Sequence, residues 1–501
     1  MRNNKKLILA GLLIAGSLLT INGQANTVQA KSYGKAVTKI AGNGNYAIYH
    51  NVSSKGPSGK FTSTKYFKHG QIQSKESRST RKGTFWKIIV DGRNVGWVSE
   101  KFFARNQISV ANEVSLVKNS DYSFPTRDAI NYATDAHGTA INPNKVHVSR
   151  KYVSTNPDKV TYSYGKAKAE VNIDVHDGDM ASPSVTPKKG FKTTSTWNGG
   201  SKGSSRNWNR AHGYRSETTS NTIKSNGLTL RTRLFQPRFL SLGYGQAGDA
   251  MGQVGVIPEG MTVNGGIFTT SLFTSSNSQY GHLVSYNLNA LKSKYAAQNL
   301  TTMKWSTFKS YAKNIKVSPY IKLGHGQSLG SSSSYIYVLA NDNKYNNGPA
   351  SEEILQIRKS DMKINKIWTF RISDNRYIHN ATFVGDDTMY ALFHNGGHNC
   401  YEYWKLTRDG DTWNATEVGA TEGRFISNSP VQGFAYGDGH FFIGFNDNIF
   451  KVSENGSAQK HYRFNTKREI EGMSATGSRL YVQFAQRAES VSYTHLTLPT
   501  T

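Results

Sequence analysis

The feature that most constrains the fold is a short phrase that recurs five times between residues 258 and 483. In each copy a polar residue precedes a small one, and a second run of alternating apolar residues follows. Anchored on the small residue, the copies lie at positions 260, 328, 381, 433 and 472, with steps of 68, 53, 52 and 39. Third and fourth alternating runs often follow within a copy, as at 353–357 and 367–370. Such self-similarity indicates a repeat architecture.

Four strands per repeat at this period predict β-propeller blades. A single sandwich would lack the repeat, and a β-helix would have a shorter period. We therefore predict an all-β chain with an incomplete propeller of about five to six blades over residues 227–490.

The first strand of each blade lines the central channel, where a small residue fits because neighbouring backbones crowd. The polar residue before it is then expected to point toward the axis. Two interpretations stay open for this ring, namely contact with a ligand and the holding of water between blades. The predicted ring consists of Glu259, Gln327, Asn380, Gln432 and Glu471.

Two members of the ring, Glu259 and Glu471, are weak candidates for catalytic residues, because glycosidases use a pair of carboxylates. No longer acidic motif accompanies them, so we expect a protein that is not an enzyme. His394, His398 and Cys400 are residue types that bind zinc, but Asn-Gly-Gly between them favours a hairpin loop. We expect no metal site and no cofactor.

The N-terminus predicts export. Three cations in the first six residues precede the apolar run 7–19, and Val28-Gln29-Ala30 offers small residues for cleavage after Ala30. The alternative, a retained membrane anchor, is disfavoured because the run of about 13 residues is shorter than the roughly 20 that a spanning helix needs. No later run is long enough to cross a bilayer, so residues 1–30 are expected to be a signal peptide.

The net charge indicates the class of binding partner, and the cysteine content indicates how the domains are stabilised. The formal net charge is +28, or +25 without the cations of the signal peptide, and this favours polyanionic partners. In a cytoplasmic protein nucleic acid would come first, but export favours teichoic acids and other anionic wall polymers of a Gram-positive cell, with no nucleic acid expected. Cys400 is the single cysteine, so the domains are expected to fold without internal disulfides.

Residues 31–105 form a first unit that is rich in aromatic residues and turns. The alternating runs 85–90 and 95–98 flank Asp91-Gly92, which is a strong signal for a two-residue hairpin. The unit has 15 Lys and Arg against three acidic residues, which makes it the most basic part of the chain.

The segments Tyr46-Ala-Ile-Tyr49, Thr84-Phe-Trp-Lys87 and Asn94-Val-Gly-Trp-Val98 resemble a GW module. Such modules are SH3-like small barrels of listerial and lactobacillal surface proteins and autolysins. The resemblance implies non-covalent attachment to lipoteichoic acid or related wall polymers. One copy is visible where tighter-binding relatives have several, so a weak, salt-sensitive attachment is expected.

Lys and Arg side chains supply charges for repeated phosphates, with simple solvation as the alternative. The module aromatics Tyr46, Tyr49, Trp86 and Trp97 resemble those of the family, and for both tryptophans packing in the barrel core is favoured. The candidate polyanion-binding residues are Lys65, Lys68, Arg81, Lys82, Lys87, Arg93 and Lys101.

Three further segments complete the domain organisation. Residues 108–176 alternate with period two and resemble a bacterial Ig-like sandwich, which implies a spacer. Residues 178–226 are rich in Ser, Thr, Lys, Gly and Asn and predict a flexible linker. Residues 491–501 resemble the translation of a sequencing-adapter read-through, so they are expected to be foreign to the fold.

These features predict a secreted, wall-associated protein that presents its propeller to a glycan or protein ligand. The propeller is also loosely similar to helveticin-like proteins, so a secreted antibacterial protein is the first alternative. An extracellular glycan hydrolase is the second.

Overall fold

The computed structural model describes residues 29–42, 44–66, 72–90, 92–111, 113–117, 124–153, 159–176, 222–225, 227–235, 257–273, 279–290, 310–341, 350–372, 378–395, 400–422, 425–426, 431–464, 469–485 and 489–493. The apolar run of the predicted signal peptide and most of the predicted linker lie outside them. Within these ranges no helix is long and apolar enough to cross a membrane.

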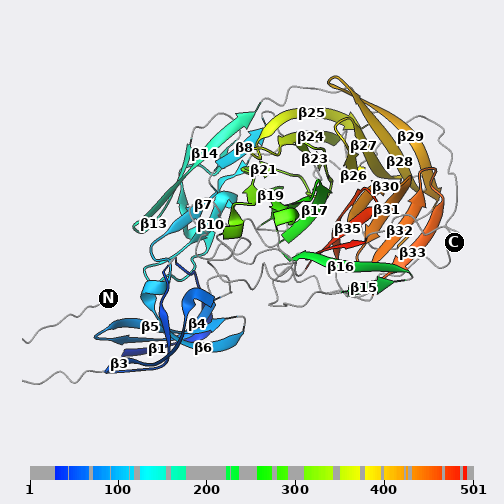
Figure 1. The fold of residues 1–501 in the computed structure, drawn as a ribbon. Helices are drawn as coiled ribbons and strands as arrows, with labels where there is room; N and C mark the ends of the chain where they lie inside the picture. Colours follow the sequence, from blue (N-terminus) through cyan, green and yellow to red (C-terminus); the bar gives the residue numbers. More distant parts are fainter. Residues whose placement is uncertain are drawn as a thin grey trace, which may run out of the picture.

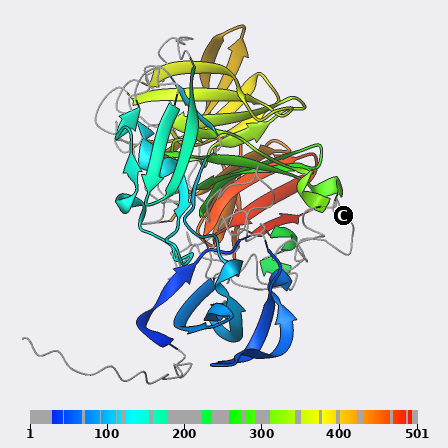
Figure 2. The ribbon, with the colours of Figure 1, turned by 90° about the vertical axis from the view of Figure 1, so that its left-hand side faces the viewer.

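The described chain is built almost entirely from β-strands in three successive parts (Figure 1). The N-terminal module lies beneath the second unit and the propeller when the molecule is viewed from the side (Figure 2). The short 3-10 helices of the described chain are η1 Thr64–Tyr66 and η2 Glu100–Phe102 in the module, η3 Thr126–Ala129 and η4 Pro143–Lys145 in the second unit, and η5 Leu288–Ala290 in the propeller.

The module is one antiparallel sheet of six strands in the order β1-β4-β5-β6-β2-β3. The predicted hairpin is confirmed, because Val90 pairs with Arg93 across the turn and Gly92 has a positive φ of 79°. The strands are β1 Gln29–Lys39, β2 Ala47–Ser53, β3 Gly56–Ser63, β4 Ile72–Thr80, β5 Gly83–Val90 and β6 Arg93–Ser99.

The second unit contains the predicted strands, and β13 pairs with β14 in the expected hairpin. Its apolar side chains pack into one core, in which the Tyr162 hydroxyl donates a hydrogen bond to the Thr126 carbonyl at 2.7 Å. The strands are β7 Ile108–Val110, β8 Glu113–Val117, β9 Phe124–Pro125, β10 Ile130–Ala133, β11 His147–Val148, β12 Tyr152–Val153, β13 Lys159–Tyr164 and β14 Ala167–His176.

The second unit is continuous with the propeller, which differs from the separate spacer that the sequence suggested. Strand β8 pairs in parallel with β14 on one side and with β21 (Tyr320–Lys322) of the first blade on the other. Tyr280 and Tyr320 of the propeller belong to the same apolar core as Phe124. The shared sheet and the shared core join the two parts, because separating them would expose both backbone hydrogen-bonding groups and aromatic surface.

The first four copies of the repeat each form one blade of the propeller, and the second and third blades are continuous in one eight-stranded sheet. Successive strands pair antiparallel within each blade, as the repeat predicted. Their strands are β17 Ile257–Asn264, β18 Ile267–Phe273, β19 Tyr280–Asn287 and β20 Ile315–Val317; β22 Leu329–Ser331, β23 Tyr335–Asn341, β24 Ala350–Arg358 and β25 Ile364–Ile372; β26 Ile378–Val384, β27 Thr388–Asn395, β28 Cys400–Asp409 and β29 Thr412–Glu422; and β30 Gly433–Gly437, β31 His440–Phe445, β32 Asn448–Ser453 and β33 Ala458–Arg463.

The fifth blade combines two distant parts of the chain in one sheet, in the order β15-β16-β36-β35-β34. The strands are β34 Ile470–Thr476, β35 Arg479–Phe484, β36 Glu489–Tyr493, β16 Leu228–Phe235 and β15 Thr222–Ser225. The sequence suggested that this blade lacks its last strands, that residues 491–493 are foreign to the fold and that 222–225 belong to a linker. In the structure all of these residues are paired, because β16 comes from before the first repeat and supplies an outer strand.

The five innermost strands, β17, β22, β26, β30 and β34, contact one another in this order, and β34 contacts β17. The described sheets therefore surround a common centre, as Figure 1 shows. Because inner strands of a propeller run in the same direction, residues at their starts are brought to one end of the channel.

Candidate functional site: the basic module and the propeller channel

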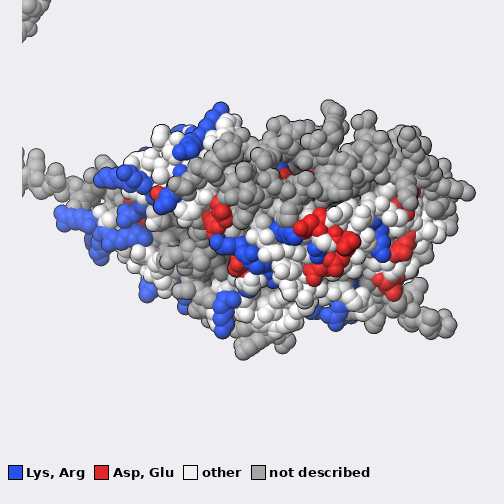
Figure 3. Space-filling model, turned by 90° about the horizontal axis from the view of Figure 1, so that it is seen from above, with Lys and Arg blue, Asp and Glu red and all other residues white. Residues whose placement is uncertain are grey.

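The predicted polyanion-binding side chains lie on the outside of the module. Each of them that the structure describes is exposed, and Lys68 lies outside the described residues. Figure 3 shows Lys and Arg gathered at the end of the molecule where the module lies, whereas Asp and Glu appear mainly over the propeller. Further exposed cations that we did not single out from the sequence are Lys31, Lys35, Lys55, Lys60 and Lys75.

The two described acidic residues of the module do little to offset these cations. Glu76 accepts two hydrogen bonds from the Arg78 guanidinium, at 3.1 and 2.8 Å, and lies 4.0 Å from the Lys87 ammonium. Glu100 is buried and interacts with groups inside the molecule. The described lysines of the module other than Lys39 therefore remain exposed to the solvent.

The module aromatics pack rather than face the solvent. Trp86 and Trp97 are 2% and 3% exposed, in two clusters on opposite sides of the sheet. Tyr46 and Tyr49 are partly buried against the same clusters. Position 96, directly before Trp97, requires glycine, because its φ is +150° and a Cβ there would lie 2.7 Å from the Tyr49 carbonyl oxygen. The Gly-Trp pair thus has a structural origin.

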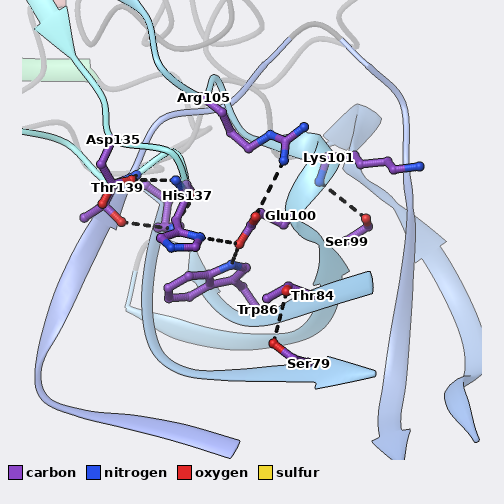
Figure 4. A network of polar contacts seen from close by, with 11 residues as sticks. Ser79, Thr84, Trp86, Ser99, Glu100, Lys101, Arg105, Asp135, His137 and Thr139 are labelled. Carbon is purple, nitrogen blue, oxygen red and sulfur yellow. Dashed lines mark hydrogen bonds and ion pairs between the residues drawn. The ribbon is translucent and has the colours of Figure 1, made fainter. Parts of the chain in front are cut away.

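A polar network joins the module to the second unit (Figure 4). The Glu100 carboxylate accepts a hydrogen bond from Trp86 Nε1 at 2.8 Å and lies 3.0 Å from His137 Nδ1 of the second unit. Arg105 lies 3.6 Å from the other carboxylate oxygen. Asp135 accepts hydrogen bonds from the His137 and Thr139 amides, both at 2.8 Å, and so shapes the turn that carries His137.

Lys39 is the exception among the cations of the module, because it is fully buried at this junction. Its ammonium donates to the His137 carbonyl at 2.5 Å and to Thr139 Oγ1 at 3.1 Å, and it lies 3.4 Å from the centre of the Trp86 ring. Burial lowers the pKa of Lys39 to about 8, although Asp135 and Glu100 oppose the shift. Lys39 therefore connects the two parts rather than serving the polyanion surface.

The propeller brings four of the five predicted ring residues together at one end of the channel. Gln327 Nε2 donates to Gln432 Oε1 at 2.5 Å and lies 3.5 Å from Glu259 Oε2. Glu259 and Glu471 are hydrogen-bonded to each other through their side chains. A carboxylate that we did not predict, Glu469, accepts from Gln432 Nε2 at 2.6 Å. It directly precedes β34, two residues before the repeated position, so the repeat itself did not reveal it.

We call Glu259, Gln327, Gln432, Glu469 and Glu471 the channel cluster. Burial, followed by the charge of Glu469, raises the pKa of Glu259 to about 8. Burial and both neighbouring carboxylates raise the pKa of Glu471 well above its ordinary value. Burial and mutual repulsion therefore favour the protonated forms of Glu259 and Glu471.

Asn380 does not join the channel cluster. It is fully buried, and its side-chain oxygen accepts a hydrogen bond from Ser328 Oγ at 3.2 Å. In β34 a bulge leaves Glu471 as the extra residue. In β26 the extra residue is His379, because Ile378 and Asn380 pair with consecutive residues of β27. The residue of β26 that corresponds to Glu471 is therefore His379, one position before the Asn380 that the repeat predicted.

The arrangement of the channel cluster is informative about chemistry. Retaining and inverting glycosidases hold their two carboxyl groups about 5 Å or more apart, so that the sugar or a water fits between them. Glu259 and Glu471 are instead joined by a hydrogen bond. His325 Nε2 lies 3.8 Å from Glu259 Oε2 with 44% of its side chain exposed, so it marks the solvent side of the cluster.

The hairpin predicted around His394 and Cys400 is present, because β27 and β28 pair as far as Asn395 and Cys400. Cys400 is buried, and the loop residues 396–399 lie outside the described part of the chain. No group of three or more His, Cys, Asp or Glu that could hold a metal ion occurs among the described residues.

Among solved structures, the chain is similar to glutaminyl cyclase of Myxococcus xanthus (10% identity over 47% of this chain and 88% of that one, TM-score 0.29). It is also similar to virginiamycin B lyase of Staphylococcus aureus (11% identity, 48% and 95%, TM-score 0.25) and to BamB of Moraxella catarrhalis (11%, 47% and 83%, TM-score 0.23). These scores are too low to support an argument, so the propeller rests on the strand pairing described above.

No curated protein matches the chain. One protein-family model does match, that of the GW (Gly-Tryp) dipeptide domain, and it covers residues 29–104. These are the residues of the six-stranded sheet and its short 3-10 helices, so the N-terminal part of this chain carries a GW domain.

Proposed function

We propose that this chain is a secreted bacterial surface protein, held non-covalently on anionic wall polymers such as teichoic acid by its GW domain, with the propeller as its recognition domain. The observation that carries the proposal is the separation of charge in the module. Its described lysines other than Lys39 are exposed, whereas its described acids are ion-paired or buried.

Such a surface suits a polymer with regularly repeated phosphates. Many exposed cations on one small domain attract a polyanion over distances comparable with the Debye length, about 10 Å at 0.1 M salt. Individual contacts of this kind are weak, so attachment would depend on their number and would fall as salt rises.

The junctions within the molecule support a role in presentation. The module is joined to the second unit by the buried Lys39 and Glu100 network, and the second unit is joined to the propeller by the β8–β21 pairing. Because both junctions connect their parts directly, attachment of the module to a wall would also set the orientation of the propeller. The second unit would then act as a rigid bracket.

We assign the propeller a binding role. The channel cluster offers carboxyl and amide groups at one end of the channel, which suits a ligand rich in hydrogen-bonding groups such as a glycan. The side-chain contact between Glu259 and Glu471 supports binding over hydrolysis, because glycosidases hold their two carboxyl groups about 5 Å or more apart.

The test is sedimentation of the full chain with purified Gram-positive walls. We expect binding at low salt, progressive release as salt rises, and loss of binding to walls from which teichoic acid has been extracted. Unchanged binding to the extracted walls would contradict the proposal. Clearing of live indicator cells by the bound protein would instead favour an antibacterial activity.

A further inference from the structure

Phe61 is an aromatic side chain of the module that neither core uses. It lies in β3, at the edge of the six-stranded sheet, and it is 45% exposed. Among the described residues, the other large hydrophobic side chains with comparable exposure are Tyr152 and Val384, in the second unit and the propeller. An exposed phenyl ring on an otherwise cationic surface needs a reason, because it gains nothing from phosphate groups.

The ring is held in place from two directions. Phe61 stacks on His50 of the neighbouring strand β2, with ring centres 4.1 Å apart and planes within 13°. Its edge lies over Gly96, where a Cβ would come within 3.1 Å of Phe61 Cε1. The glycine of the Gly-Trp pair thus makes room for this ring. A ring whose position is set before binding loses little conformational entropy when a ligand covers it.

Exposed lysines lie along the same edge strand as the ring. Lys60 precedes Phe61 in β3. At the start of β3 the Lys82 side chain lies along Gly56, where a Cβ would be 2.9 Å from Lys82 Cδ. The strand therefore combines positive charge with one flat apolar surface, and its outer side is not covered by another strand of the sheet.

We propose that the Phe61–His50 pair, which we call the aromatic platform, binds the sugar rings of a glycosylated polyol-phosphate polymer while the neighbouring lysines bind its phosphates. This inference rests on the proposed function and names the class of polymer. A pyranose ring has an apolar face of C–H groups that packs on an aromatic ring, and its hydroxyls remain in water. A polymer without sugar substituents has no such face.

The experiment measures affinity of the full chain for two immobilised probes at one salt concentration, namely unsubstituted polyglycerol phosphate and the same polymer bearing glucosyl substituents. The wild-type chain is expected to bind the glucosylated polymer more tightly. Phe61→Ala should weaken binding to that polymer about tenfold, equivalent to about 1.4 kcal/mol, and change binding to the unsubstituted polymer less than about twofold. Phe61→Tyr should keep the preference because it keeps the ring.

Tyr152→Ala is the matched control, because it removes an equally exposed ring from the second unit and should change neither affinity. An unchanged melting temperature checks the fold of each variant. An equal loss on both polymers after Phe61→Ala, or no loss on either, would overturn the aromatic platform while leaving the wall-binding function in place. If the wild-type chain binds neither polymer, the proposed function itself fails.

Discussion

The module and the propeller are both built from antiparallel sheets, but they place charge in opposite ways. Residues 31–105 carry 15 Lys and Arg against three acids, whereas residues 227–490 carry 27 against 20. The module keeps nearly all of its cations in water, while the propeller buries three carboxyl groups in its channel cluster. A charge in water costs little and acts at long range, whereas burial favours the neutral forms of Glu259 and Glu471, which then act at contact distance. Attachment and selective contact therefore belong to different parts of the chain.

The largest expected effect concerns the buried carboxyl groups of the propeller and their effect on stability. Because the pKa of Glu259 is raised from 4.5 to about 8, its contribution to stability is fully present below pH 4.5 and is lost as pH rises toward 8. The loss corresponds to up to about 5 kcal/mol, at about 1.4 kcal/mol per pH unit. Glu259→Gln cannot ionise, so it should unfold at higher denaturant than the wild type at pH 8 and show a weaker dependence on pH.

The measurement is guanidinium unfolding of both proteins at pH 5 and pH 8. Asp409→Asn, at an exposed site in the same domain, controls for the general effect of removing an acid. Parallel pH profiles for Glu259→Gln and the wild type would show that the channel cluster does not hold the protons we assign to it.

The second prediction compares a buried carboxylate with an exposed one inside the module. Glu100→Gln should lower the free energy of unfolding by about 3 kcal/mol, because it removes the negative charge that balances the buried Lys39 and lies beside His137. Glu76→Gln, in a partly exposed ion pair with Arg78, should cost less than about 1 kcal/mol. Tryptophan fluorescence during denaturation reports both changes, and similar values for the two variants would contradict the difference between these sites.

The third prediction concerns the exposed cations of the module and their effect on wall binding. Replacing five exposed cations of the module with Gln should weaken wall binding on the order of a hundredfold at low salt, at about 0.5 kcal/mol for each charge. It should also flatten the dependence of binding on salt. The replaced residues are Lys65, Arg81, Lys82, Arg93 and Lys101.

A variant with the same loss of charge elsewhere is the control for this prediction. Its replaced residues are exposed cations of the second unit and the propeller, and it should bind walls nearly as well as the wild type. If it loses as much affinity as the module variant, net charge rather than the module surface explains the binding. These residues are Lys145, Arg150, Lys166, Lys168 and Lys313.

The smallest effect separates cations within the module. Lys87 already lies near Glu76, so Lys87→Gln should change wall binding less than about twofold, whereas Arg93→Gln should lower it about twofold to threefold. Sedimentation with walls at several salt concentrations measures both. A larger loss at Lys87 would mean that the polymer displaces Glu76 from its ion pairs.

Much of the fold and part of the site could be predicted because their signals are local. The Asp-Gly turn between two alternating runs specifies a hairpin, and the recurring phrase specifies blades. Each of these patterns is formed by residues that lie close together in the sequence. The polar residue before the small one led to Glu259, Gln327, Gln432 and Glu471, because each blade repeats the same inner strand. The local pattern missed Glu469 because it lies two residues before the repeated position, and it misplaced Asn380 because a bulge shifts the register of β26 by one residue.

The sequence by itself determined the all-β class, the repeated blades, the basic GW module and the excess of cations, because side-chain period, turn residues and composition are read along the chain. Only the tertiary structure decided that β16 closes the sheet of β34–β36, that β8 joins the second unit to the first blade, and that Lys39 is buried while the other described lysines of the module are exposed. These outcomes depend on which distant strands meet. Pairing between residues more than 200 positions apart leaves no periodic trace, and burial of a charge depends on the groups that the fold brings to it.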